Sequence, residues 1–218
     1  IGGSVIASPP NSSLIKEYAE VLTRLRSKGH QFIVIVGGGS LAREFIHLAR
    51  EVGLTDEEQD EIAISVSRMF AQILAIKLGG LGAKQIPTSL DEATRIFETH
   101  GIAFMGGLKP GMTTDTVATM AALRIQAHLI LKATDQEGIY TKDPRKYPDA
   151  EKIDELRFED LSRMLEEDRH IVGIHQILDP EAARLLQKER IETIVVNGFK
   201  PENIILAIKG EKIGTRIH

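Results

Sequence analysis

The chain has 218 residues, 42% of them hydrophobic, which is enough to bury a sizeable core in one domain or in two fused lobes. Its formal net charge of -4 gives no general attraction to nucleic acid or to an anionic membrane, and no apolar run approaches the ~20 residues that span a bilayer, so we expect neither partner. The absence of cysteine excludes disulfides, thiolate zinc sites and a cysteine nucleophile, and it fits a cytoplasmic location.

Helices and strands alternate along most of the sequence. In chain order, we predict a helix over residues 13–28, a strand over 32–36, helices over 41–52 and 57–78, a helix opened by a capping box at Ser89–Glu92, strands over 102–107 and 128–134, a helix opened by Asp179-Pro180, a strand over 193–198, a last helix from Pro201 and a closing strand at Gly214–Ile217. This order predicts an α/β protein with helices on both sides of a mostly parallel central sheet. Because the sequence opens in the middle of a motif, we also expect a strand before Ile1.

Glycines cluster at the carboxyl ends of three predicted strands. They are Gly2-Gly3, Gly37 to Gly39, and Gly106-Gly107. Ligands bind at this edge of an open α/β sheet, and glycine lets the backbone approach them closely. One such turn could serve packing alone, but three predict a broad surface for a polyanionic ligand.

The turn Gly37-x-Gly39-x-x-Ala42 also fits the pattern of a dinucleotide-binding loop. That function needs an acidic residue about 20 positions further on, at the end of the next strand. The sequence there, VGLTDEEQDE, is the entry to a predicted helix, and no Walker loop occurs anywhere in the chain. Another phosphate ester is therefore favoured.

Five motifs in order carry a family resemblance: IGGSVI, VIVGGGSLAREF, FMGGLKPGMTTDTVA, KATDQEGIYTKDP and ILDPEAARLL. Together they resemble the amino acid kinase family, and within it the archaeal type of uridylate (UMP) kinase. The resemblance implies a three-layer α/β/α sandwich in which residues 1–218 form a single amino acid kinase domain. Its N-terminal acceptor lobe would span about residues 1–125, and its C-terminal ATP lobe about residues 126–218.

The resemblance also implies an activity and an assembly. The enzyme would transfer the γ-phosphoryl group of MgATP to UMP, giving ADP and UDP in pyrimidine nucleotide biosynthesis. Magnesium would be carried by ATP oxygens, with no metal site on the protein. The spacing of His170 and His175 is also poor for a zinc site.

The resemblance further implies a homohexamer built as a trimer of dimers. The predicted helix over residues 57–78 offers apolar side chains, which fit either such an interface or packing against the sheet of the same chain: Ile62, Val66, Met69, Phe70 and Leu74.

By the same resemblance, ATP would be bound by Gly2, Gly3, Ser4, Gly38, Arg43, Thr134, Tyr140 and Asp143. Ser4, Arg43 and Asp115 would be the catalytic residues. Three of these residues also have an alternative role that involves no ligand. Arg43 fits a solvent-exposed arginine on a helix, Tyr140 fits an aromatic that packs in the core, and Asp115 fits a helix cap. Lys132 lies near a strand end, and it fits an ordinary surface lysine better than a phosphate ligand.

UMP would be bound by Gly37, Asp60, Leu108, Lys109, Pro110, Gly111, Met112, Thr113 and Thr114. A carboxylate such as Asp60 can accept two hydrogen bonds from a ribose diol, although it also lies in an acidic helix start. Two threonine hydroxyls at a helix N-terminus suit a monoester phosphate. Arg68, two turns beyond Asp60, would reach that phosphate or lie at the surface.

Two segments depart from the family pattern. Asp135-Gln136-Glu137 replaces the usual N-V-D, and Met112 stands where histidine is common. The lysine that often precedes the first glycine pair would lie before Ile1. Two alternative functions stay open: another small-molecule kinase similar to isopentenyl phosphate kinase, although the histidine expected after GGGS is replaced by Leu41-Ala42-Arg43, and a non-catalytic storage protein for nucleotides or oxyanions.

Overall fold

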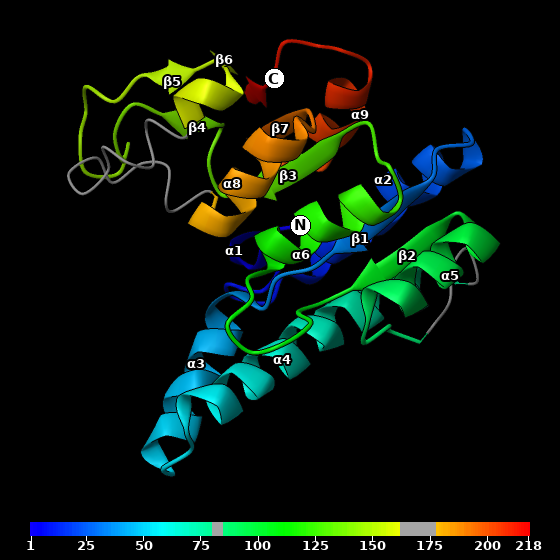
Figure 1. The fold of residues 1–218 in the computed structure, drawn as a ribbon, viewed down its shortest axis with the longest axis vertical. Helices are drawn as coiled ribbons and strands as arrows, with labels where there is room; N and C mark the ends of the chain where they lie inside the picture. Colours follow the sequence, from blue (N-terminus) through cyan, green and yellow to red (C-terminus); the bar gives the residue numbers. More distant parts are fainter. Residues whose placement is uncertain (80–84, 162–177) are drawn as a thin grey trace. The chain divides into compact units, whose positions relative to one another are not determined.

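The computed structural model describes residues 1–79, 85–161 and 178–218, and the chain divides into two compact units, residues 1–125 and 126–218 (Figure 1). The first unit contains α1 (Gly3–Ile6), α2 (Ser12–Ser27), β1 (Phe32–Ile35), α3 (Gly39–Glu51), α4 (Asp56–Lys77), α5 (Leu90–His100), β2 (Ile102–Met105) and α6 (Thr114–Arg124). The second contains β3 (Ile130–Thr134), β4 (Ile139–Tyr140), β5 (Lys152–Ile153), β6 (Glu155–Leu156), α8 (Pro180–Glu189), β7 (Thr193–Asn197), α9 (Glu202–Ile208) and β8 (Thr215–Ile217).

Two parallel strands organise the first unit. β1 pairs with β2 from Phe32 beside Ile102 to Ile35 beside Met105. Every residue of β2 is buried, as expected for a short apolar strand that is covered on both faces. The carboxyl ends of both strands therefore lie at one edge, and each continues directly into a glycine-rich turn.

A small hydrophobic core joins these strands to the helices that follow them. It contains Ile35 of β1, Met105 of β2, Ala93 of α5, and Val117 and Ala121 of α6. On another side, α4 packs against β2, and α3 packs along α4 (Figure 1). The segment that leaves β2 thus begins between α4 and this core.

Residue Ile1 extends the strand pairing beyond β1. Its N–H donates to the carbonyl of Ile35 at 2.7 Å, and its carbonyl accepts from the N–H of Gly37 at 3.0 Å. These two bonds have the pattern of a parallel ladder. They place the first glycine turn directly beside the turn that follows β1.

The helix starts agree with the predictions to within a few residues, but the caps of α2 and α4 differ from what the sequence analysis identified. α2 is capped by Asn11, whose side chain accepts from the N–H of Leu14 at 3.1 Å, and not by Ser12 or Ser13. α4 opens with a complete capping box between Thr55 and Glu58, which the sequence analysis did not identify. Hydrogen bonds from the Thr55 backbone and hydroxyl lower the pKa of the Glu58 carboxyl.

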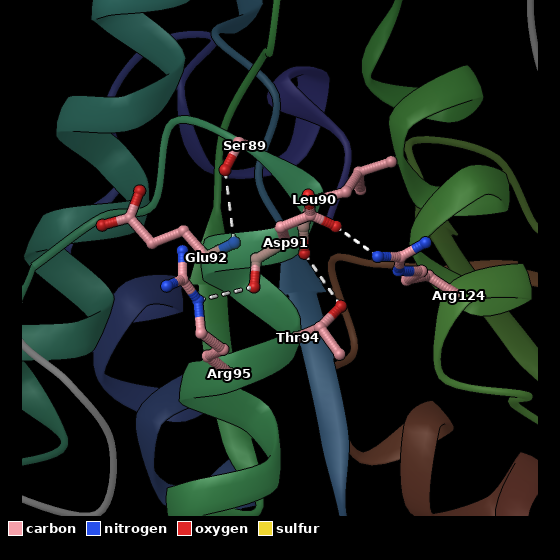
Figure 2. Close-up of polar contacts among 7 residues, drawn as sticks. All are labelled: Ser89, Leu90, Asp91, Glu92, Thr94, Arg95 and Arg124. Atoms are coloured by element: carbon pink, nitrogen blue, oxygen red, sulfur yellow. Dashed lines mark hydrogen bonds and ion pairs between the residues drawn. The ribbon is translucent and has the colours of Figure 1, made fainter.

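The start of α5 is fixed by several polar contacts (Figure 2). Ser89 accepts from the N–H of Glu92 at 3.2 Å, as predicted, but the Glu92 carboxylate bonds to the N–H of Thr88 instead of completing a box with Ser89. Asp91 pairs with Arg124 in the last turn of α6, so the two helices are tied together at the surface.

The second unit contains a four-stranded sheet in the order β3-β7-β8-β6. The pairs β3–β7 and β6–β8 are parallel, whereas β7–β8 is antiparallel. β4 and β5 form a separate antiparallel pair. The predicted α/β class and the predicted strands over 128–134, 193–198 and 214–217 are confirmed, whereas the two-residue strands β5 and β6 were not anticipated.

No helix in the described part of the chain combines the length and the apolar composition needed to cross a membrane.

Candidate active site

The first two glycine turns interlock. A Cβ atom on Gly3 would lie 2.1 Å from the backbone nitrogen of Gly39, and one on Gly37 would lie 2.6 Å from the nitrogen of Gly3. Gly39 has a φ of +61°, and a Cβ there would lie 2.2 Å from the carbonyl oxygen of Gly3. Packing between the two turns therefore requires these glycines, whatever ligand binds above them.

Ser8 holds the same junction together. Its hydroxyl donates to the carbonyl of Gly3 at 3.0 Å and accepts from the N–H of Ser40 at 2.5 Å. The Ser40 hydroxyl in turn donates to the carbonyl of Ala7 at 3.2 Å. Sequence reasoning missed Ser8, because its role depends on a contact with a residue 32 positions away.

Arg43 lies one turn into α3, as predicted from the sequence. Its side chain is exposed, and it has no hydrogen-bond or ion-pair partner among the residues that the structure describes. Ser4 is the second residue of the short helix α1, within the interlocked turns. Gly38 lies at the N-terminus of α3, where a Cβ atom would lie 2.6 Å from the Cβ of Ala42.

The segment from Gly106 to Thr113, here called the acceptor loop, joins β2 to α6. At its tip the N–H of Met112 donates to the carbonyl of Lys109 at 3.2 Å, and Gly111 has a φ of +74°. Proline followed by a glycine with positive φ is typical of a type II turn, so Pro110-Gly111 explains the bend. A Cβ on Gly111 would meet nothing within 4 Å, so its backbone conformation, and not crowding, requires glycine.

Side chains of α4 bond to the acceptor loop along its length. The Asp60 carboxylate accepts from the N–H of Gly111 at 2.7 Å. The Ser67 hydroxyl accepts from the buried N–H of Gly107 at 2.8 Å. Arg68 donates through Nε to the carbonyl of Gly107 at 3.0 Å and through Nη2 to the carbonyl of Leu108 at 3.1 Å.

Close packing reinforces these bonds. A Cβ atom on Gly106 would lie 2.5 Å from the backbone nitrogen of Arg68, and one on Gly107 would lie 2.9 Å from Ile64. On its other side, the loop packs Leu108 and Met112 against the hydrophobic core. Met112, at the position where the family pattern has histidine, therefore serves as an apolar anchor.

The N-terminus of α6 follows the loop. The Thr113 hydroxyl caps the helix by accepting from the N–H of Thr116 at 3.2 Å. Thr114 and Asp115 form the first turn, and the carbonyl of Asp115 accepts from the Thr119 hydroxyl at 3.0 Å. The structure thus brings Asp60 and the predicted residues Leu108 to Thr114 together in the first unit.

In the second unit, Thr134 and Asp143 belong to one polar network. The Thr134 hydroxyl donates to Asp135 at 3.2 Å, and Arg145 donates to the same carboxylate at 2.9 Å. The backbone N–H of Arg145 donates to the buried carboxylate of Asp143 at 3.0 Å. The sequence analysis did not anticipate a role for Arg145.

Glu137, in the segment that departs from the family pattern, is bound from two sides. It accepts from the Asn197 amide at 2.8 Å and from Lys200 at 3.0 Å. The hydrogen bonds from Asn197 and then Lys200 lower the pKa of this carboxyl. Tyr140, predicted to contact ATP, is half-buried in β4 and pairs with Lys152 of β5.

Two lysines and two histidines complete the candidates named from the sequence. Lys109 is exposed in the acceptor loop, and Lys132 is half-buried in β3. Over residues 1–79, 85–161 and 178–218, no group of three or more His, Asp or Glu side chains could hold a metal ion. His170 and His175 lie outside the described residues.

The whole chain is similar to proteins named uridylate kinase. It is 42% identical over 217 residues to that of Methanothrix thermoacetophila, covering 100% of this chain and 96% of the relative. It is 36% identical over 219 residues to that of Methanocaldococcus jannaschii, with the same coverage. The crystal structure of uridylate kinase from Archaeoglobus fulgidus matches with a TM-score of 0.89 at 34% identity, covering 100% of this chain and 97% of that one.

These likenesses confirm the α/β sandwich fold that the five motifs implied. The sequence pattern of the amino acid kinase family matches residues 1–197. The chain therefore belongs to the amino acid kinase family.

Proposed function

We propose that this protein is a UMP kinase, which transfers the γ-phosphoryl group of MgATP to UMP and releases ADP and UDP in pyrimidine nucleotide biosynthesis. The observation that carries the proposal is the likeness, over the whole chain, to relatives named uridylate kinase at up to 42% identity. The first unit, residues 1–125, is proposed as the acceptor lobe, and the second, residues 126–218, as the ATP lobe.

The chemistry requires orientation and charge neutralisation more than a strong base. The UMP phosphate is already anionic at neutral pH, so it can attack the γ-phosphorus of ATP directly and in line. We propose Arg43 to neutralise charge on the transferred group, since it is exposed next to the interlocked turns. Ser4 and Asp115 are proposed to hold the phosphates and the surrounding groups in position.

The acceptor site is proposed to comprise Gly37, Asp60 and the loop residues Leu108 to Thr114. Asp60 already uses one carboxylate oxygen to hold the N–H of Gly111. Its other oxygen has no hydrogen-bond partner among the described residues and is proposed to accept from a ribose hydroxyl, so a single side chain would support the loop and bind the nucleoside. The exposed side chains of Lys109 and Thr113 border the same loop.

Gly2, Gly3, Ser4, Gly38 and Arg43 are proposed to bind ATP, and Thr134, Tyr140 and Asp143 are proposed as further ATP-binding residues. The bonds that join Thr134 and Asp143 through Asp135 and Arg145 support a shared role for these residues. Magnesium enters as part of the substrate MgATP. A cytoplasmic location, predicted from composition, belongs to the same proposal.

We propose that the protein assembles as a homohexamer, a trimer of dimers. An exposed apolar face on α3 and α4 supports an interface between copies: Phe45, Leu48, Val52, Met69, Ile73 and Ile76. Of the α4 side chains named from the sequence, Val66, Phe70 and Leu74 are buried within the first unit, which is the internal packing that the sequence left open beside an interface. Light scattering on the Ile73→Glu variant should report smaller particles than the wild type.

A coupled ATP assay with UMP, CMP and isopentenyl phosphate tests the activity. We expect turnover with UMP and much less with the other two acceptors. Arg43→Ala should lower kcat at least about tenfold while leaving the circular dichroism spectrum unchanged. Nucleotide binding without turnover by the wild type would favour the storage alternative, and preferred turnover of isopentenyl phosphate would favour the other kinase.

A further inference from the structure

Arg68 fixes the orientation of two successive peptide groups in the acceptor loop. Its guanidinium donates to the carbonyls of Gly107 and Leu108 at 3.0 and 3.1 Å. In a planar trans peptide the N–H points opposite to the carbonyl. The N–H groups of Leu108 and Lys109 therefore face away from Arg68.

Those two N–H groups are available to a ligand. Neither donates to any residue that the structure describes, whereas the preceding N–H, that of Gly107, is bound by the Ser67 hydroxyl at 2.8 Å. Two neighbouring amides turned to the same side suit the oxygens of an anionic phosphate. The side chains of α4 thus determine which loop amides are used inside the protein and which remain for the substrate.

We propose that Ser67 and Arg68 are positioning residues, which hold the acceptor loop so that the amides of Leu108 and Lys109 face the phosphate of the acceptor nucleotide. This inference rests on the proposed UMP kinase function. It gives Arg68 a role different from the direct phosphate contact considered from the sequence, since the two donor groups observed are bound to loop carbonyls.

The planar fork of arginine is essential to this role. Lysine retains the charge, but its single ammonium group cannot donate to both carbonyls in the geometry of the planar guanidinium group. Arg68→Lys should therefore behave almost like Arg68→Met. A residue that acted only through its charge would instead be rescued by lysine.

Steady-state kinetics of Arg68→Lys, Arg68→Met and Ser67→Ala test the proposal. We expect the KM for UMP to rise at least about tenfold, with the KM for ATP unchanged and kcat altered less than about threefold. Arg95→Met is the matched control, because Arg95 is an exposed arginine of the same unit that donates to a backbone carbonyl at 3.3 Å. It should behave as the wild type.

Hydrogen exchange of the ligand-free proteins gives a readout that does not depend on turnover. The hydrogen-bonded loop amides, those of Gly107, Gly111 and Met112, should exchange faster in the three variants than in the wild type and in Arg95→Met. Unchanged exchange there, or an unchanged KM for UMP in a wild type that is active, overturns the positioning role. If Ser67→Ala does not fold, the two Arg68 variants decide the result.

Failure of the proposed UMP kinase function can be distinguished from failure of the positioning role. A wild type that does not phosphorylate UMP overturns that function and, with it, the role for a UMP phosphate. Faster loop exchange in the variants would then still assign Ser67 and Arg68 to positioning the loop for another acceptor, which the panel of acceptors in the activity assay would identify.

Discussion

The acceptor loop and the segment from Thr134 to Arg145 are held in place by different interactions. The loop is bound through its own backbone, by Asp60, Ser67 and Arg68, and it packs on the hydrophobic core. The other segment has buried or partly buried bonds too, from the N–H of Ile139 to Thr215 and from the N–H of Arg145 to Asp143, but its carboxylates Asp135 and Glu137 are held by surface ion pairs with Arg145 and Lys200. The Arg145 and Lys200 side chains in these pairs are 59% and 63% exposed.

The two regions should therefore respond differently to added salt. Exposed ion pairs are weak and are screened by salt. The bond between Ser67 and Gly107 is buried and those of Arg68 are partly buried, so they cost more to break and depend less on ionic strength. The acceptor loop should therefore be rigid before substrate arrives. The segment from Thr134 to Arg145 should be easier to loosen.

The largest effect is expected from Gly106→Ala. The new Cβ would lie 2.5 Å from the backbone nitrogen of Arg68, so the loop or α4 must move. We expect the free energy of unfolding to fall by about 3 kcal/mol, measured by urea denaturation. A loss no greater than that of Gly29→Ala, where a Cβ meets nothing within 4 Å, would show that the loop is not tightly packed on α4.

Gly111→Ala should have an intermediate effect that separates stability from function. Gly111 and Gly29 both have positive φ, +74° and +87°, and both have open space around a Cβ. Each alanine variant should lose about 1–2 kcal/mol of stability through backbone strain. Only Gly111→Ala should also raise the KM for UMP, by about tenfold, because it alone alters the acceptor turn. Equal KM values in the two variants would argue against that turn as the acceptor site.

The smallest effect is expected from acid titration of Glu137. Hydrogen bonds from Asn197 and Lys200 lower its pKa below the ordinary value of 4.5. Its stabilising contribution is therefore complete above about pH 4.5 and is lost as the pH falls through the lower, folded-state pKa. The melting temperature of the wild type should decline more steeply below that pH than the melting temperature of Glu137→Gln.

Glu98→Gln provides the control for this titration, since Glu98 is exposed and has no hydrogen-bond or ion-pair partner in the described part of the chain. Its melting curve should follow that of the wild type at every pH. Parallel curves for all three proteins would show that the Glu137 carboxylate does not stabilise the second unit. Added salt should reduce the difference between Glu137→Gln and the wild type.

Periodicity and composition predicted the principal elements well. The apolar runs that form β1 and β2 are too short for helices, and Asp179-Pro180 opens α8 through the predicted cap. Strands of two residues, such as β5 and β6, carry no period that could be detected. The cap of α2 was misplaced because Asn11, Ser12 and Ser13 are neighbouring residues that can each cap a helix.

The contacts around the site were less predictable. The bonds of Arg68 join residues 39 and 40 positions apart, and no local pattern encodes such a pair. The sequence analysis assigned the glycines to close approach of a ligand, which stays a prediction. The fold shows that Gly106 and Gly107 are needed for contact with α4, a reason that no local pattern reveals. The roles assigned to Arg43, Asp115 and the residues of the second unit remain predictions.

The interlocked turns at Gly3, Gly37 and Gly39 limit how this protein can diverge. A side chain gained at one position cannot be accommodated by shrinking its neighbour, because the neighbour is already glycine. No second-site replacement within the trio can rescue the first. New acceptor preferences are therefore expected to arise by substitutions elsewhere, at positions such as Lys109 whose side chains face open solvent.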